Sequence, residues 1–174
     1  MTGLLLLLAL TAAEPLSPVE QTAAALAAGE AALETGRHEA LLAAADRLDR
    51  LGARGEMAAA WRLRALAAGA RAGSAPWRGR ATGPAYRRGE LPSGGRLATE
   101  QVFMAGEAAL VAVVPVGAQP LHVSITGPDG AAICEQRVTP PRAACRWLPV
   151  FTKRFRISIA NPGPTPARYY LVSN

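Results

Sequence analysis

The chain has 174 residues, a formal net charge of +6 and 50% hydrophobic residues. This length allows one ordinary domain, or a small domain beside a smaller appendage, and the hydrophobic content is enough to form a core. The basic excess is almost entirely arginine, because Lys153 is the only lysine. A GC-rich genome produces that bias without selection for binding, so charge alone does not establish a polyanion-binding function.

Residues 1–13 have the pattern of a secretory signal peptide. An apolar run from Leu4 to Leu10 is followed by the small residues Thr11, Ala12 and Ala13. The run suits the apolar region of a signal peptide and is far too short to span a bilayer. We therefore expect export to the periplasm or cell envelope, with cleavage before Glu14. A buried first helical turn is the alternative, because no Lys or Arg precedes the run.

Residues 14–70 are predicted to be helical. Ser17, Pro18 and Glu20 form the pattern of a capping box with proline in the first turn, which predicts that a helix begins here and runs toward Gly36. A second helix is expected from His38 to Leu51. A third is expected to begin near residue 57 and to end near residue 69.

The stretch AAGEAALETGRHEALLAAADRL, which ends the first of these helices and forms most of the second, resembles one unit of a tetratricopeptide repeat. A solenoid of such units needs about three of them to close its core. The sequence therefore favours a helical hairpin followed by a third helix, with a repeat assembly as the alternative.

Residues 71–89 are rich in Gly, Pro, Ser and Arg and are predicted to be a linker that leads into an edge strand near residues 87–91. Short segments with period-two alternation follow, and Leu110 to Val114 is a more continuously apolar strand that Pro115 is expected to close. About seven or eight strands at this spacing predict an antiparallel β-sandwich over residues 90–174. The expected fold class is α+β, with the helices and strands segregated along the chain.

The segments ELPSGGRLATEQVFMAGEAALVAVV, LHVSITGPDGAAI and CRWLPVFTKRFRISIANPGPTPARYYLVSN resemble the bacterial pre-peptidase C-terminal (PPC-like) β-sandwich. The resemblance implies a non-catalytic domain of the kind that accompanies secreted enzymes. Some such domains carry acidic residues that could hold calcium before the Asp-Gly turn. Here the strand reads LHVS and only Asp129 remains, so no calcium and no other cofactor is expected.

Cys134 and Cys145 lie on two consecutive predicted strands. An exported chain favours a disulfide between them, and the alternative is two small buried thiols on strands whose faces do not match. A zinc site would have to combine them with His38 and His122 without any C-x-x-C pair, so it is not expected. No nucleophile, metalloprotease or phosphate-loop motif is present, and we expect that the protein is not an enzyme.

The remaining functional feature is charge, because residues 73–174 hold twelve Lys or Arg against five Asp or Glu. Lys153, Arg154 and Arg156, with Arg87 and Arg88, are the candidate polyanion-binding residues. Solvated strand faces are the alternative, since Arg154 and Arg156 alternate with apolar positions.

The sequence thus favours an exported, non-catalytic accessory or protein-interaction module, whose partner would be an envelope protein. The alternative is an arginine-rich binder of anionic lipid, lipopolysaccharide or acidic glycan. Nucleic acid is not an expected partner, because an exported protein rarely meets it and the chain carries no nucleic-acid-binding motif.

Overall fold

The computed structural model describes residues 15–71 and 83–174, which form three helices followed by eight antiparallel strands in two sheets. The predicted α+β class is therefore confirmed. The predicted signal peptide lies outside the described residues. The helices are α1 (Pro18–Glu34), α2 (His38–Arg50) and α3 (Met57–Ala67). The strands are β1 (Ala85–Leu91), β2 (Arg96–Phe103), β3 (Ala109–Val116), β4 (Leu121–Thr126), β5 (Ala132–Val138), β6 (Ala143–Trp147), β7 (Lys153–Ala160) and β8 (Ala167–Ser173).

The helices begin and end where the sequence predicts. The Ser17 hydroxyl accepts from the Glu20 amide, and the Glu20 carboxylate accepts from the Ser17 amide, so both halves of the capping box form. Gly36 and Gly52 follow α1 and α2 with φ of 64° and 63°. This left-handed conformation suits glycine and ends each helix.

The strands form two four-stranded sheets that pack face to face. Sheet A has the order β1-β8-β3-β6 and sheet B has the order β2-β7-β4-β5. Successive strands therefore alternate between the sheets, except for the β4–β5 hairpin within sheet B, which is the strand order of a jelly roll. The inner faces of both sheets share one apolar core, which includes Val111, Val123 and Ile157.

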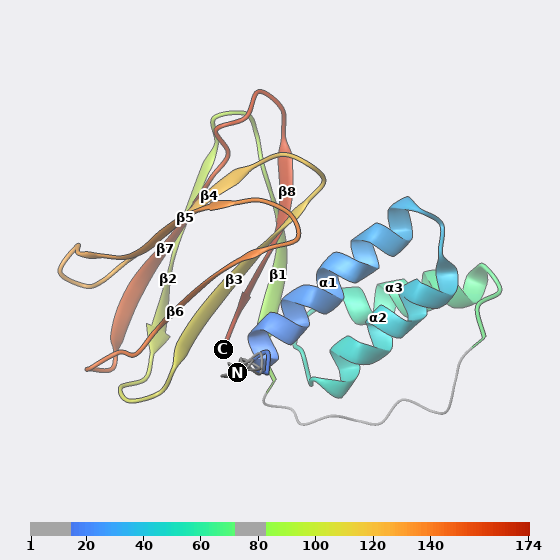
Figure 1. The fold of residues 1–174 in the computed structure, drawn as a ribbon, viewed down its shortest axis with the longest axis horizontal. Helices are drawn as coiled ribbons and strands as arrows, with labels where there is room; N and C mark the ends of the chain where they lie inside the picture. The colour runs from blue at the N-terminus through green and yellow to red at the C-terminus, as the bar shows by residue number, and fades with distance from the viewer. Residues whose placement is uncertain (1–14, 72–82) are drawn as a thin grey trace, which may run out of the picture.

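The helices add a third layer, because they cover the outer face of sheet A (Figure 1). Helix α1 contacts β3 and β8, and a second core joins Leu26 and Leu48 of the helices to Leu110, Val114 and other residues of sheet A. The helical region is thus not a separate appendage. It shares its core with the sandwich.

Strand β3 continues through Pro115 to Val116, so the expectation that Pro115 closes the strand is wrong. The pairing of β3 with β6 stops at Val113, whereas its pairing with β8 extends to Val116. One edge of β3 is therefore open at Pro115, where a residue without an amide hydrogen is tolerated.

Strand β1 begins at Ala85, inside the segment that the sequence assigns to the linker, and it is held against the helices. The Tyr86 hydroxyl accepts from the amides of Met57 and Ala58, at 3.0 and 3.3 Å, and so caps the start of α3. The residue before α3, Glu56, makes no side-chain cap of its own. A strand residue therefore satisfies donors that the helix leaves open.

Candidate functional site: an apolar tip with a basic flank

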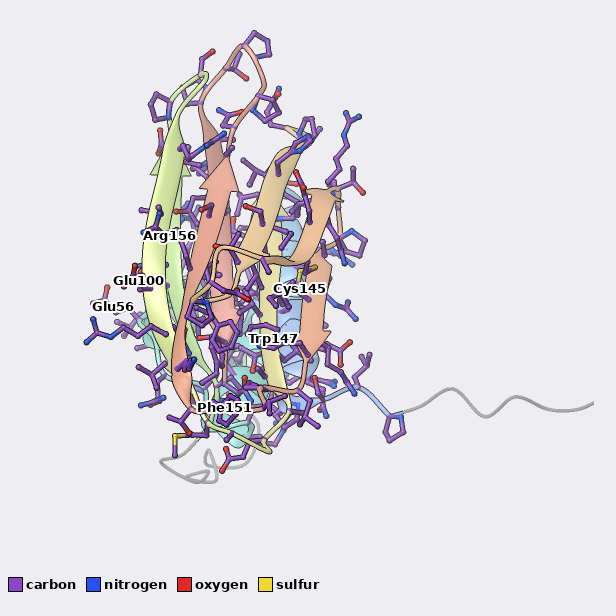
Figure 2. All side chains as sticks on the ribbon, turned by 90° about the vertical axis from the view of Figure 1, so that its left-hand side faces the viewer. Glu56, Glu100, Cys145, Trp147, Phe151 and Arg156 are labelled. Carbon is purple, nitrogen blue, oxygen red and sulfur yellow. A yellow bond between two sulfur atoms is a disulfide. The ribbon has the colours of Figure 1, made fainter. Side chains whose placement is uncertain are left out.

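Four large apolar side chains lie exposed at one end of the sandwich, in the loops that join β2 to β3 and β6 to β7. Their exposed fractions are 54% for Met104, 64% for Leu148, 79% for Val150 and 66% for Phe151. Figure 2 shows Phe151 at this end, with Trp147 above it. We call these four residues the apolar tip. Such a concentration of exposed apolar residues marks an interaction surface.

The two loops of the apolar tip are bonded to each other. The Gly106 amide donates to the Pro149 carbonyl at 2.9 Å, and the Ala105 amide donates to the Thr152 hydroxyl at 2.9 Å. Pro149 is buried between exposed neighbours. The exposed side chains are therefore presented by a connected pair of loops.

An aromatic cluster inside the end of the sandwich supports these loops. The Trp147 ring lies 4.7 Å from that of Phe103 and 5.4 Å from that of Phe155, measured between centroids. Phe103 ends β2 and Trp147 ends β6, so each ring comes immediately before a tip residue. The contact with Phe103 is edge to face and the contact with Phe155 is tilted, and such ring contacts hold the base from which the tip projects.

Two cations begin β7 directly beside the apolar tip. The Lys153 ammonium lies 5.5 Å from the centroid of the Phe151 ring, and Arg154 is exposed opposite Val102 of β2. Neither cation makes an ion pair within residues 15–71 and 83–174. We call Lys153 and Arg154 the basic flank, and both charges are available to an anionic partner. The carboxylate of Glu107 belongs to the same loop as Met104 but borders a separate cavity beside α1.

The other predicted polyanion-binding residues lie elsewhere. Arg156 is further along β7, where it forms an ion pair with Glu100 at 3.4 Å (Figure 2). Arg87 lines a small cavity at the β1 edge together with Glu100, and Arg88 lines a different cavity together with Glu30. The structure therefore places Lys153 and Arg154 beside the apolar tip. Arg156 follows on the same strand but is paired with Glu100, and Arg87 and Arg88 belong to sheet A.

The apolar tip could not be recognised from charged and catalytic residue types. One signal was present: LPVF, residues 148–151, is an apolar run between two strands, at a place where a connecting loop is normally polar. Neighbouring Met104 could not be associated with it, because the pairing of β2 with β7 cannot be read from the chain.

Cys134 and Cys145 form the predicted disulfide, with their Cα atoms 6.0 Å apart. Cys134 belongs to β5 of sheet B and Cys145 to β6 of sheet A, so the bond joins the two sheets. Cys145 is buried in the inner core. The pair fastens one edge of the sandwich.

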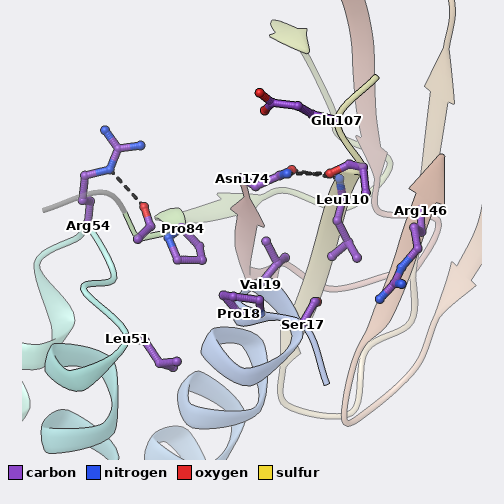
Figure 3. Close-up of a pocket in the computed structure, with 12 residues that line it drawn as sticks. Ser17, Pro18, Val19, Leu51, Arg54, Pro84, Glu107, Leu110, Arg146 and Asn174 are labelled. Atoms are coloured by element: carbon purple, nitrogen blue, oxygen red, sulfur yellow. Dashed lines mark hydrogen bonds between the residues drawn. The ribbon is translucent and has the colours of Figure 1, made fainter. Parts of the chain in front are cut away.

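A cavity of about 620 Å³ lies between the start of α1 and the tip end of sheet A (Figure 3). Most of its polar side chains are occupied by structural contacts. The Arg54 guanidinium donates to the Gly83 carbonyl at 3.3 Å, and the Asn174 side chain bonds both the Leu110 amide and the Ala108 carbonyl. This cavity is a seam between layers rather than the best candidate site.

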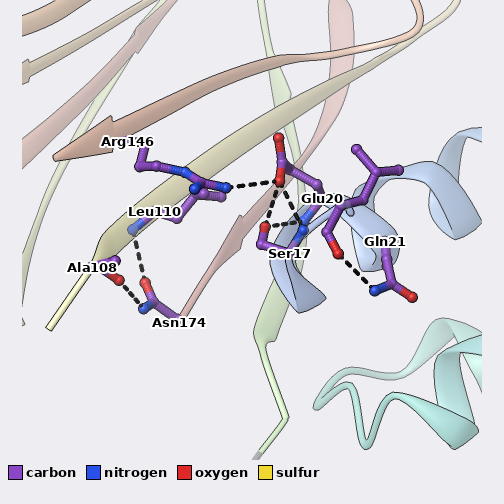
Figure 4. Close-up of polar contacts among 8 residues, drawn as sticks. Ser17, Glu20, Gln21, Ala108, Leu110, Arg146 and Asn174 are labelled. Atoms are coloured by element: carbon purple, nitrogen blue, oxygen red, sulfur yellow. Dashed lines mark hydrogen bonds and ion pairs between the residues drawn. The ribbon is translucent and has the colours of Figure 1, made fainter. Parts of the chain in front are cut away.

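The same seam contains an ion pair that joins a helix to a strand. The Arg146 guanidinium lies 3.3 Å from the Glu20 carboxylate, which also closes the capping box with Ser17 (Figure 4). The hydrogen bond from the Ser17 side chain lowers the pKa of Glu20 below its usual value, and Arg146 adds to this effect. Glu20 is therefore ionised at neutral pH and links α1 to β6.

The histidines are not assembled into a site. His122 is exposed on the outer face of sheet B and His38 begins α2. Across the part of the chain that the structure describes, no group of three or more His, Cys, Asp or Glu side chains is placed to hold a metal ion. In the same residues, no helix has the length and apolar character needed to cross a membrane.

Comparison with known proteins gives no family. No protein-family model matches the chain, and no curated protein matches it. Among solved structures, it is similar to the periplasmic inhibitor of g-type lysozyme from Aeromonas hydrophila, at 14% identity and a TM-score of 0.40, over 52% of this chain and 84% of that one. The mitogen from Yersinia pseudotuberculosis gives 11% identity and a TM-score of 0.42 over the same shares. At these scores neither likeness carries a functional argument.

Proposed function

We propose that this protein is an exported, non-catalytic accessory module that attaches to an anionic lipid surface of the bacterial envelope through the apolar tip. The observation that carries the proposal is the combination of four exposed apolar side chains with the cations of the basic flank, which make no ion pair to the described residues. Both features strengthen peripheral membrane binding, because apolar side chains enter the acyl boundary while cations meet the anionic headgroups.

The expected affinity is modest. Full burial of one such side chain is worth about 1.5–3 kcal/mol, and each cation near an anionic surface adds about 1 kcal/mol. The four tip residues and the basic flank together suffice for reversible attachment after part of the gain is lost to ordering. A soluble glycan offers no hydrocarbon layer for Val150 and Phe151, which is why lipid is the favoured anionic partner.

Export is part of this proposal. The Cys134–Cys145 disulfide supports it, because such bonds form and persist in oxidising compartments. The PPC-like resemblance remains a sequence-based prediction that fits a non-catalytic role and does not identify a partner.

Vesicle sedimentation tests the attachment. We expect the full chain to sediment with vesicles of phosphatidylethanolamine and phosphatidylglycerol at about 50 mM salt, and less with vesicles of phosphatidylcholine alone. Val150→Ser with Phe151→Ser should abolish sedimentation on both. Lys153→Gln with Arg154→Gln should remove only the dependence on anionic lipid and on salt.

The control is Leu63→Ser, which changes an exposed leucine of α3 away from the tip and should leave sedimentation unchanged. All variants keep the same N-terminal residues, so a difference between them reports on the changed side chains. The proposal is wrong if the native chain does not sediment at low salt, or if the Val150→Ser, Phe151→Ser variant sediments like the native chain.

A further inference from the structure

A second cleft, of about 620 Å³, lies where the helical layer meets the outer face of sheet A. Its walls come from four elements that are distant in sequence, namely α1, α3, β1 and β8. Neither the apolar tip nor the basic flank contributes to it. The cleft is therefore a separate candidate site.

Three arginines from three elements line this cleft: Arg64 of α3, Arg88 of β1 and Arg168 of β8. Their guanidinium groups make no hydrogen bond or ion pair with any part of the chain that the structure describes. Arg88 and Arg168 extend from neighbouring strands, since Arg88 pairs with Tyr170 and Arg168 with Glu90. Guanidinium groups gathered around a cleft favour carboxylate ligands, which they can hold through paired hydrogen bonds.

Two carboxylates share the cleft with the arginines. Glu30 lines the cleft and accepts a hydrogen bond from the Tyr170 hydroxyl, and the exposed Glu34 lies one turn further along α1. Burial and the Glu30 carboxylate raise the pKa of Tyr170, so this hydroxyl stays protonated and keeps donating. The cleft thus offers acceptors for N–H groups beside its cationic groups.

The rest of the wall is apolar. Leu33, Met57 and Ala60 line the cleft around the ring of Trp61, which is itself buried. On the same helix Leu63 is 71% exposed, which extends the apolar surface beyond the cleft. A ligand that fits must therefore carry an apolar group together with its negative charge.

We propose that this cleft binds an acidic peptide segment of a partner protein, with a carboxylate held by Arg88 and Arg168 and an apolar side chain against Leu33 and Met57. A peptide supplies all three complementary features: carboxylates for the arginines, an apolar side chain for the wall, and backbone amides for Glu34. An acidic glycan supplies the first but has no large apolar side chain. The apolar wall therefore favours the peptide.

The position of the cleft allows both sites to be used at once. Arg168 is near the start of β8, at the end of the sandwich where β7 finishes. The apolar tip lies at the other end, where β7 begins. In Figure 1 this start of β8 is at the end opposite the β6–β7 connection. A chain attached to lipid through the tip would keep the cleft directed toward a soluble partner. The peptide site itself stands without the lipid proposal.

Selection from a displayed library of random dodecapeptides, with the full chain as target, tests the cleft. We expect enriched sequences with Asp or Glu near Leu or Phe, whose affinity falls at least about tenfold on Arg88→Glu with Arg168→Glu. The matched control is Arg137→Glu with Arg156→Glu, which makes the same charge change on sheet B, outside the basic flank, and should leave affinity unchanged. Ala60→Gln should also weaken binding, because it fills the cleft and leaves its charge unchanged.

Two results would overturn the proposal. One is the absence of any enriched acidic peptide. The other is an enriched peptide that both arginine pairs affect equally, since that response reflects net charge alone. Loss of binding to a heparin decasaccharide on Arg88→Glu with Arg168→Glu, without an enriched peptide, would assign the cleft to acidic glycans instead. The thermal unfolding midpoint of each variant shows that it is folded.

Discussion

The two sheets of the sandwich have equal numbers of strands, but only sheet A is covered on both faces. Every residue of β3 in sheet A is buried, because one set of side chains faces the inner core and the other faces the helices. In β7 of sheet B, Phe155, Ile157 and Ile159 are buried while Arg154 and Arg156 face solvent. A continuously apolar strand thus indicates that a second layer covers the outer face of its sheet. A strand that alternates apolar and charged residues has one face in solvent.

The largest expected effect comes from removing the main side chain that joins the helices to sheet A. Trp61 is 3% exposed and its ring meets that of Tyr170 edge to face. Trp61→Ala should lower the free energy of unfolding by about 3–5 kcal/mol, measured by urea denaturation. Leu63→Ala, on the exposed side of the same helix, should change it by less than about 0.5 kcal/mol. Equal effects would mean that the helical layer does not share the core.

The disulfide tests how firmly sheet A is joined to sheet B at the β5–β6 edge. Cys134 and Cys145 are separated by 11 positions, so the bond restricts a short loop of the unfolded chain. Replacing both by serine should lower the free energy of unfolding by about 2–3 kcal/mol. Reduction of the native chain with dithiothreitol should produce a similar loss, and the same treatment should leave the double variant unchanged. A reducing agent that affects both equally would contradict this interpretation.

The cap that β1 provides to α3 should have a smaller effect. Tyr86→Phe removes the acceptor for the Met57 and Ala58 amides. We expect the free energy of unfolding to fall by about 1–2 kcal/mol, because these two hydrogen bonds are part-buried and buried. Tyr169→Phe is the control on the inner side of sheet A, since no hydrogen bond of its hydroxyl is present within the described structure. Thermal denaturation should show a lower midpoint for the first variant only.

The smallest effect concerns the Glu20 link between α1 and β6. Because its pKa is lowered in the folded protein, Glu20 adds stability above its usual value of 4.5, and this stability is lost as the pH falls through the lowered value. Glu20→Gln should cost up to about 1 kcal/mol at pH 7, and the difference from the native chain should vanish in acid. Glu135→Gln, at an exposed residue of β5 without an ion pair in the described structure, is the control and should leave the free energy of unfolding at pH 7 unchanged. A difference that does not shrink as the pH falls would exclude ionisation as the cause.

Much of the fold could be predicted from local patterns. The capping box at Ser17 and the glycines at 36 and 52 locate helix ends, and alternation locates most strands, because these signals act over a few residues. The continuously apolar stretch from Leu110 to Val114 was also visible. Its cause, the helices on the outer face of sheet A, depends on contacts between distant segments and could not be read from the chain.

The candidate site was less predictable for the same reason. Lys153 and Arg154 could be recognised as exposed cations, but their neighbour Met104 belongs to another loop that only strand pairing brings close. Arg87, Arg88 and Arg156 seemed equivalent by charge alone. The structure distinguishes them by their neighbouring carboxylates, which lie far away in sequence, as Glu100 does from Arg156. Residue types are visible in the sequence, whereas the neighbours of each side chain depend on how the strands pair.

The seam beside α1 has one consequence for the order of the chain. Ser17 and Asn174 line the same cavity, so the two ends of the described structure meet there. Folds with adjacent ends tolerate circular permutation. A gene that joins position 174 to position 15 and begins at position 83 would encode the sandwich first and the helices last. Because α1 would still meet β3 and β8, the rearranged chain should fold with the same three layers. The fold would then not depend on whether the helices or the strands are synthesised first.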